Sequence, residues 1–170
     1  MKKNRGFTVF FAILVASLAL AIGLAIYDLT LRELNITATS TQSQYAIYAA
    51  DTGAECALYW DAKYQGSKSV FATSTASVPP TSGIVCNTQD IAAGPPPWTL
   101  VKTANAATTT FTFYVSSVSQ SSATTTCVKV EVGKYTALGG VPNTNIVSHG
   151  YNTCIVGARG QLERVFQINY

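Results

Sequence analysis

The chain has 170 residues, 48% of them hydrophobic and 11% charged, with a formal net charge of +3 at pH 7. Three of its eleven basic residues lie at the N-terminus, which leaves eight bases against eight acids in the rest of the chain. Those eight bases are scattered, whereas binding to a phosphate backbone requires clustered positive charge. We therefore predict no specific nucleic-acid partner.

The N-terminus joins a short basic segment, residues 1–6, to an uncharged stretch that runs from Phe7 to Tyr27. An apolar α-helix of about 20 residues is long enough to cross a bilayer. Because Lys2, Lys3 and Arg5 precede this stretch, the positive-inside rule keeps them in the cytoplasm. We expect one membrane span over 7–27, with the rest of the chain outside the cytoplasm.

Three interpretations of this N-terminus compete. A secretory signal cleaved after Ala19-Leu20-Ala21 explains the short basic segment and the small residues. However, the apolar run continues to Tyr27, so that cleavage would leave an exposed apolar end. An uncleaved single-pass anchor explains the length of the span equally well. The third interpretation depends on the residues of the basic segment themselves.

The segment Lys2-Lys3-Asn4-Arg5-Gly6-Phe7-Thr8, with the apolar stretch after it, resembles the leader of type IV pilins and pseudopilins. The resemblance implies that residues 1–6 are a leader peptide, which a prepilin peptidase removes by cleavage between Gly6 and Phe7. Phe7 would then become an N-methylated N-terminus. The helix would wait in the inner membrane and later pack against the helices of other pilin subunits in a cell-surface fibre.

One position departs from the family pattern. Most major pilins have a glutamate at the position that Phe11 occupies here, and a buried carboxylate needs a partner. Its absence favours a minor pilin or a pseudopilin over a major subunit. The resemblance leaves open whether the fibre is a pilus or a secretion pseudopilus.

The helix is predicted to continue outside the membrane over residues 28–64, because apolar and aromatic residues recur at spacings of three, four or seven. Within it, small residues form one stripe at Ala46, Ala50, Gly53 and Ala57. Helix-on-sheet packing is the simplest explanation of that stripe. The segment 45–55 also resembles the alanine-rich helix of minor pilins of the PilX type.

Residues 65–170 are predicted to form a β-rich domain. Phe111, Phe113 and Val115 alternate with polar residues, and Val128, Val130 and Val132 do the same. Prolines at 79–80 and 95–97 and the Ser/Thr-rich segment 116–126 indicate loops. The expected fold class is α+β, a long N-terminal helix packed on an antiparallel sheet, which the resemblance identifies as the pilin fold.

The four cysteines, Cys56, Cys86, Cys127 and Cys154, lack the spacing of a zinc site. An even number outside the cytoplasm indicates two disulfides with three possible connectivities. A hairpin around Gly139-Gly140 that places Cys127 opposite Cys154, and Val130 opposite Tyr151, favours pairing Cys127 with Cys154. Cys56 would then pair with Cys86.

The sequence contains no constellation that indicates catalysis. His149 is the single histidine, and no acid or nucleophile is identifiable as its partner, so we expect it to be a sheet or surface residue. No cofactor motif and no metal site are predicted. The expected function is that of a structural, non-enzymatic subunit. A membrane-anchored binding module that never polymerises is the alternative, and a secreted hydrolase is a remote third.

Overall fold

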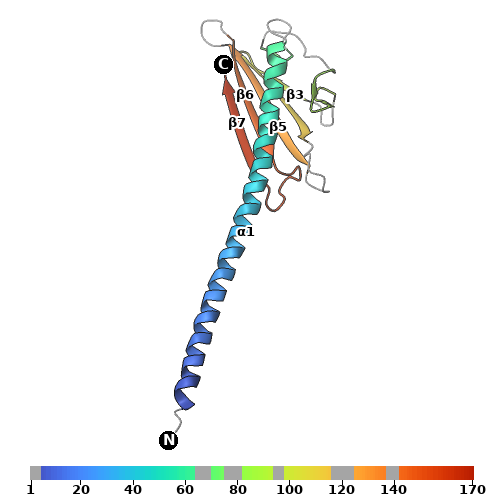
Figure 1. Cartoon of the computed structure of the whole chain (residues 1–170). Helices are drawn as coiled ribbons and strands as arrows, with labels where there is room; N and C mark the ends of the chain where they lie inside the picture. The colour runs from blue at the N-terminus through green and yellow to red at the C-terminus, as the bar shows by residue number, and fades with distance from the viewer. Residues whose placement is uncertain (1–4, 64–69, 75–81, 94–97, 116–124, 137–141) are drawn as a thin grey trace. The chain divides into compact units, whose positions relative to one another are not determined.

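The computed structural model describes residues 5–63, 70–74, 82–93, 98–115, 125–136 and 142–170 (Figure 1). Its architecture is α+β, as predicted, with one long helix, α1 (Arg5–Lys63), and an antiparallel sheet. The strands are β1 (Val85–Cys86), β2 (Gln89–Asp90), β3 (Thr99–Lys102), β4 (Ala106–Val115), β5 (Thr126–Thr136), β6 (Pro142–Tyr151) and β7 (Glu163–Asn169). The prolines expected in loops and residues 116–124 lie outside the described residues.

The chain divides into two compact units, Met1–Thr41 and Gln42–Tyr170. In the first unit, every described side chain of α1 from Phe7 to Thr41 is exposed. Its last turns are rich in threonine, and the hydroxyls of Thr37, Thr39 and Thr41 donate to carbonyls four residues earlier. These hydrogen bonds satisfy the threonine hydroxyls without interrupting the helix.

The second unit contains the sheet, whose strands follow the order β3-β4-β5-β6-β7, and a separate hairpin of β1 and β2. Neighbouring strands in the large sheet are antiparallel, so the chain runs as a meander from one edge to the other. The last turns of α1, from Gln42 on, cover one face of this sheet (Figure 1). Successive residues along each strand therefore point in turn to the face covered by the helix and to the open face.

The predicted alternation is confirmed in β4 and β5. Phe111, Phe113 and the valines at 128, 130 and 132 are almost fully buried under the helix. Tyr114, on the opposite face of β4, is 48% exposed. Phe71 stacks on Phe111 with their ring centroids 5.8 Å apart, which closes the core beyond the helix.

The small residues of α1 meet small residues of β6. A Cβ atom added at Gly150 would collide with the backbone of Ala46 and Ala50, and one added at Gly53 would collide with Ser148 and Val128. The Ser148 hydroxyl donates to the Ala50 carbonyl over 2.7 Å. The stripe is thus a close helix-on-sheet contact, the simplest of the predicted explanations.

The predicted pairing register of β5 and β6 is wrong by three residues. The two strands do form an antiparallel hairpin, but Cys127 lies opposite Tyr151 and Val130 lies opposite Ser148. The predicted register would have placed Tyr151 beneath the helix, where no large side chain fits. The observed register instead places Ser148 and Gly150 there, because a shift by an odd number of residues exchanges the two faces of a strand.

A buried ion pair joins the end of α1 to the sheet. Lys134 Nζ lies 2.6 Å from Asp61 Oδ1, and the Tyr170 hydroxyl donates to Asp61 Oδ2 over 2.7 Å. Both charged side chains are nearly excluded from solvent. Tyr170 also exchanges backbone hydrogen bonds with Thr144, so the C-terminal residue is attached through its backbone and its side chain.

The contact at Gly150 predicts a steric effect of one methyl group. Gly150→Ala should lower the free energy of unfolding by about 1–3 kcal/mol, because the added Cβ forces the helix away from the sheet. Gly133→Ala is the matched control, because the added Cβ there meets only ordinary contacts. Urea unfolding of the full chain in detergent measures both, and equal effects would contradict the close approach.

The Asp61–Lys134 pair predicts a large loss of stability when one partner is removed. Asp61→Ala should cost about 3–5 kcal/mol, because it leaves the Lys134 ammonium buried without a counter-ion. Glu131→Ala, which removes the exposed Lys129–Glu131 pair of the open face, should cost no more than about 1 kcal/mol. Denaturant unfolding compares the two variants, and a cost of Asp61→Ala as small as that of Glu131→Ala would show that Lys134 does not depend on Asp61.

Candidate functional site

The first candidate site is the apolar surface of α1 in the first unit. Phe7, Phe10, Leu20 and Leu24 are each more than 60% exposed, in a stretch without a charged side chain between Phe7 and Tyr27. Among the described residues, α1 is the one helix that is long and apolar enough to cross a membrane. Large exposed apolar surfaces are typical of membrane or protein interaction sites, which makes this surface a candidate interface.

The ends of this apolar surface are chemically distinct. α1 begins at Arg5, so the Gly6–Phe7 peptide bond lies in its first turn, whereas residues 1–4 lie outside the described part of the chain. Phe11 is 57% exposed and belongs to the apolar surface. At the other end, Arg32 and Asp28 form an exposed ion pair one helical turn apart. Cleavage at Gly6–Phe7 and methylation of Phe7 stay predictions.

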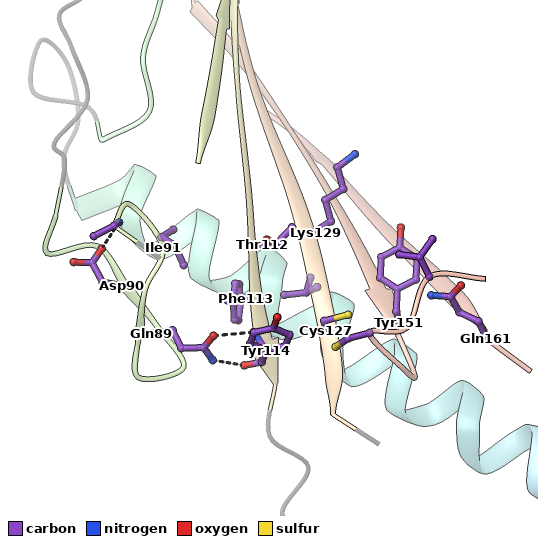
Figure 2. A pocket seen from close by; sticks show the side chains of 14 residues that line it. Gln89, Asp90, Ile91, Thr112, Phe113, Tyr114, Cys127, Lys129, Tyr151 and Gln161 are labelled. Carbon is purple, nitrogen blue, oxygen red and sulfur yellow. Dashed lines mark hydrogen bonds between the residues drawn. The ribbon is translucent and has the colours of Figure 1, made fainter. Parts of the chain in front are cut away.

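The second candidate site is a cavity of about 680 Å³ in the sheet domain (Figure 2). The β1–β2 hairpin and the residues after it form one wall of the cavity. Its floor is lined by Phe113 and Tyr114 from β4 and by Cys127 from β5. Cys154, Val156 and Gln161, from the segment between β6 and β7, form the opposite wall. No sequence pattern predicted this cavity, because its walls come together only through the strand order.

The polar groups of the first wall are already occupied by hydrogen bonds within the chain. The Gln89 side chain donates to the Tyr114 carbonyl and accepts from the Tyr114 N–H, as the dashed lines of Figure 2 show. Asp90 accepts from the backbone N–H groups of Gly83, Ala92 and Ala93. These donors, that of Gly83 first, lower the pKa of the Asp90 carboxyl. The amide and the carboxylate shape the wall and leave the interior mainly apolar.

The two predicted cysteine pairs differ in the structure. Cys56 and Cys86 form a disulfide with their Cα atoms 5.9 Å apart, which attaches β1 to α1. Cys127 and Cys154 are free thiols in the structure, and the Cys154 thiol donates to the Thr125 carbonyl over 3.0 Å. A bond between Cys127 and Cys154 stays a prediction.

His149 has an acidic partner that the sequence analysis did not identify. On the open face of the sheet, His149 Nδ1 lies 2.5 Å from Glu163 Oε1, and the Tyr151 hydroxyl donates to the same oxygen over 3.1 Å. The bond from His149 is the main cause that lowers the pKa of Glu163. Burial, and then the Glu163 charge, raise the pKa of Tyr151 to about 12. β6 and β7 bring these groups together through the pairing of His149 with Val165.

This arrangement joins a histidine, a carboxylate and a phenolic hydroxyl by hydrogen bonds but presents no activated nucleophile. Cys127 lies opposite Tyr151 on the same face, and burial raises the pKa of its thiol, which disfavours the reactive thiolate. Among the described residues, no group of three or more His, Cys, Asp or Glu side chains is arranged to hold a metal ion. His149 is a sheet residue, as expected.

Comparison with known proteins yielded no match among protein-family models, curated proteins or solved structures.

The His149–Glu163 bond predicts how stability depends on pH. Because the folded state lowers the pKa of Glu163, its contribution is fully present above the unfolded pKa of about 4.3 and is lost as the pH falls through the folded value. Glu163→Gln should therefore flatten the fall of unfolding free energy below about pH 4.3. Unfolding titrations between neutral and acidic pH measure this, with exposed Glu55→Gln as the control. If the unfolding free energy of Glu163→Gln fell at acidic pH as steeply as that of the wild type, the result would contradict the role given to Glu163.

Proposed function

We propose that this chain is a type IV pilin-like structural subunit, a minor pilin or pseudopilin, that is anchored in the inner membrane and assembles into a fibre through α1. The observation that carries the proposal is the exposed apolar surface of α1, which begins at Phe7 directly after Arg5-Gly6. Its partners are a prepilin peptidase and the helices of other subunits. Its activity is assembly, and no catalytic step is assigned to it.

The contrast between the two parts of α1 supports this proposal. From Gln42 on, the helix has a buried face in which Ala46, Ala49, Ala50 and Ala57 are fully covered by their own domain. From Phe7 to Thr41, all of its described side chains are exposed. The second part is satisfied within the chain, whereas the first part requires an apolar environment that the chain does not supply. A bilayer before assembly and a bundle of identical helices afterwards both provide one.

The charge distribution also supports the proposed function. The three bases before Phe7 carry the whole net charge, so their removal would leave a neutral mature chain. Neutral subunits pack together without long-range repulsion. The absence of an acid at Phe11 favours a minor position in the fibre, because no buried carboxylate is present there to pair with a neighbouring N-terminal amine.

A membrane-anchored binding module is the second candidate, and the cavity of about 680 Å³ is the observation that favours it. Cavities of this size with a mainly apolar lining bind small ligands in many proteins. In this alternative the leader is never removed and α1 serves as a permanent anchor. The two candidates therefore differ at the N-terminus of the mature protein.

Intact-mass and N-terminal peptide analysis of the protein from its native membrane distinguishes them. We expect a chain that lacks residues 1–6 and begins at N-methylated Phe7, because a prepilin peptidase acts at the Gly6–Phe7 bond. Gly6→Val should abolish this processing, since a branched side chain replaces the hydrogen at the cleavage position. Gly23→Val, within the same helix and with open space around its Cα, is the matched control and should be processed normally.

An intact Met1 in the mature wild-type protein would contradict the pilin-like proposal and favour the anchored binding module. A start near Ile22 would contradict both and indicate an ordinary secretory signal cleaved after Ala21.

A further inference from the structure

β7 forms one edge of the large sheet, and its outer side is unpaired (Figure 1). Thr144 and Tyr170 exchange both of their backbone hydrogen bonds where β6 meets the end of β7. Because the bonding direction alternates along an antiparallel strand, the N–H and C=O groups of Val165, Gln167 and Asn169 point away from β6. In the described part of the chain, none of these groups has a hydrogen-bond partner. β7 therefore presents a row of main-chain donors and acceptors that matches the backbone of another extended strand.

This edge lacks the features that protect the opposite edge of the sheet. β3 has 4 residues, includes the charged Lys102 and follows prolines at 95–97. Short strands, lysine and proline are features that prevent an edge from pairing with other chains. β7 has 7 residues, and its segment 165–169 contains neither a proline nor a charged side chain. Of the two edges, β7 is therefore the one that can accept a further strand.

An apolar step, formed by Ile47 and Phe166, lies beside this edge. The Arg164 side chain of β7 donates to the Ser43 hydroxyl of α1 over 2.9 Å, and the two elements are joined again near their C-terminal ends. Ile47 follows Ser43 by one helical turn and is 39% exposed. Phe166, which pairs with Ser148 on the covered face of the sheet, is 40% exposed. Both side chains of the apolar step therefore lie along the junction between α1 and β7.

We propose that the free edge of β7 binds an extended segment of another protein, which adds a strand to the sheet. The backbone of that segment would pair with Val165, Gln167 and Asn169. Because side chains alternate between the faces of a strand, every second residue of the segment would lie over the apolar step. The partner is therefore a segment with apolar residues at alternate positions.

The charges at the start of β7 favour an uncharged partner segment. The Glu163 carboxylate is bonded to His149, and the Arg164 side chain is bonded to Ser43. Both charged side chains thus have partners within the chain and offer no unpaired charge to a ligand. Alternating apolar and uncharged polar residues match this edge better than charged residues do.

A second copy of β7 fits the proposed function less well than a different protein does. Two β7 strands that pair about a twofold axis perpendicular to the sheet are antiparallel, and their α1 helices run in opposite directions. Subunits that are anchored in one bilayer have helices that run in the same direction. Strand addition at β7 does not depend on the proposed function, but the preference for a different protein over a second copy does.

Amide hydrogen exchange of the full chain in detergent, measured residue by residue, tests strand addition. The probe is a synthetic peptide of alternating valine and threonine, 7 residues long like β7. At millimolar peptide, exchange at Val165, Gln167 and Asn169 should slow by about tenfold or more, because their N–H groups become hydrogen-bonded. The matched control is the same peptide with N-methyl groups at alternate positions. It keeps the side chains but cannot pair through its backbone, so it should leave exchange unchanged.

Two variants at one position locate the binding site. Gln167→Pro removes an outward N–H group and should weaken binding of the labelled peptide by about tenfold or more in fluorescence anisotropy. Gln167→Thr changes the side chain but keeps that N–H group, and it should bind the peptide as the wild type does. Should Gln167→Pro fail to fold, the two peptides still provide the comparison.

Unchanged exchange at Val165 and Gln167 in millimolar peptide would overturn the proposal, and so would equal protection by the N-methylated peptide. Protection that arises without peptide and increases with protein concentration would identify a second copy as the occupant and overturn the assignment to a different protein. None of these results depends on whether residues 1–6 are removed. A failure of strand addition is therefore distinguishable from a failure of the proposed function.

Discussion

The close approach of α1 to β6 is the contact on which the rest of the sheet domain depends. Gly150 and Ser148 lie against the backbone of Ala46 and Ala50, at a distance that excludes a single additional methyl group. That contact determines which face of β6 is covered, and therefore the register between β5 and β6. The register in turn places His149, Tyr151 and Cys127 together on the open face. One steric constraint thus determines both which side chains form the core and which side chains lie on the open face.

The helix makes this contact only from Gln42 on, and this division underlies the proposed function. Small side chains let the second part bury its face in the sheet, whereas the first part has bulky apolar side chains and no cover within the chain. Exposed apolar surfaces of this size commonly mark membrane or protein interaction sites. The same surface is what a subunit needs if it is stored in a bilayer and later packs among other helices.

Local patterns in the sequence predicted much of this fold, because they depend on residues close together in the chain. The alternation of Phe111 and Phe113 indicated a half-buried strand, and the stripe from Ala46 to Ala57 indicated close packing. The register of β6 could not be predicted, since it depends on which residues tolerate the helix backbone, and the bulk of Tyr151 was not weighed against Gly150. Glu163 was missed as the partner of His149 because β7 approaches β6 only after a long excursion of the chain.

Immunogold electron microscopy of cells that express the chain, with an antibody against residues 42–170, tests the central claim most directly. The account predicts label on fibres that extend from the cell surface, and loss of that label in the Gly6→Val variant while the protein persists in the membrane. Label confined to the cell envelope in the wild type, with no fibre carrying it, would contradict assembly and leave the anchored binding module as the better description.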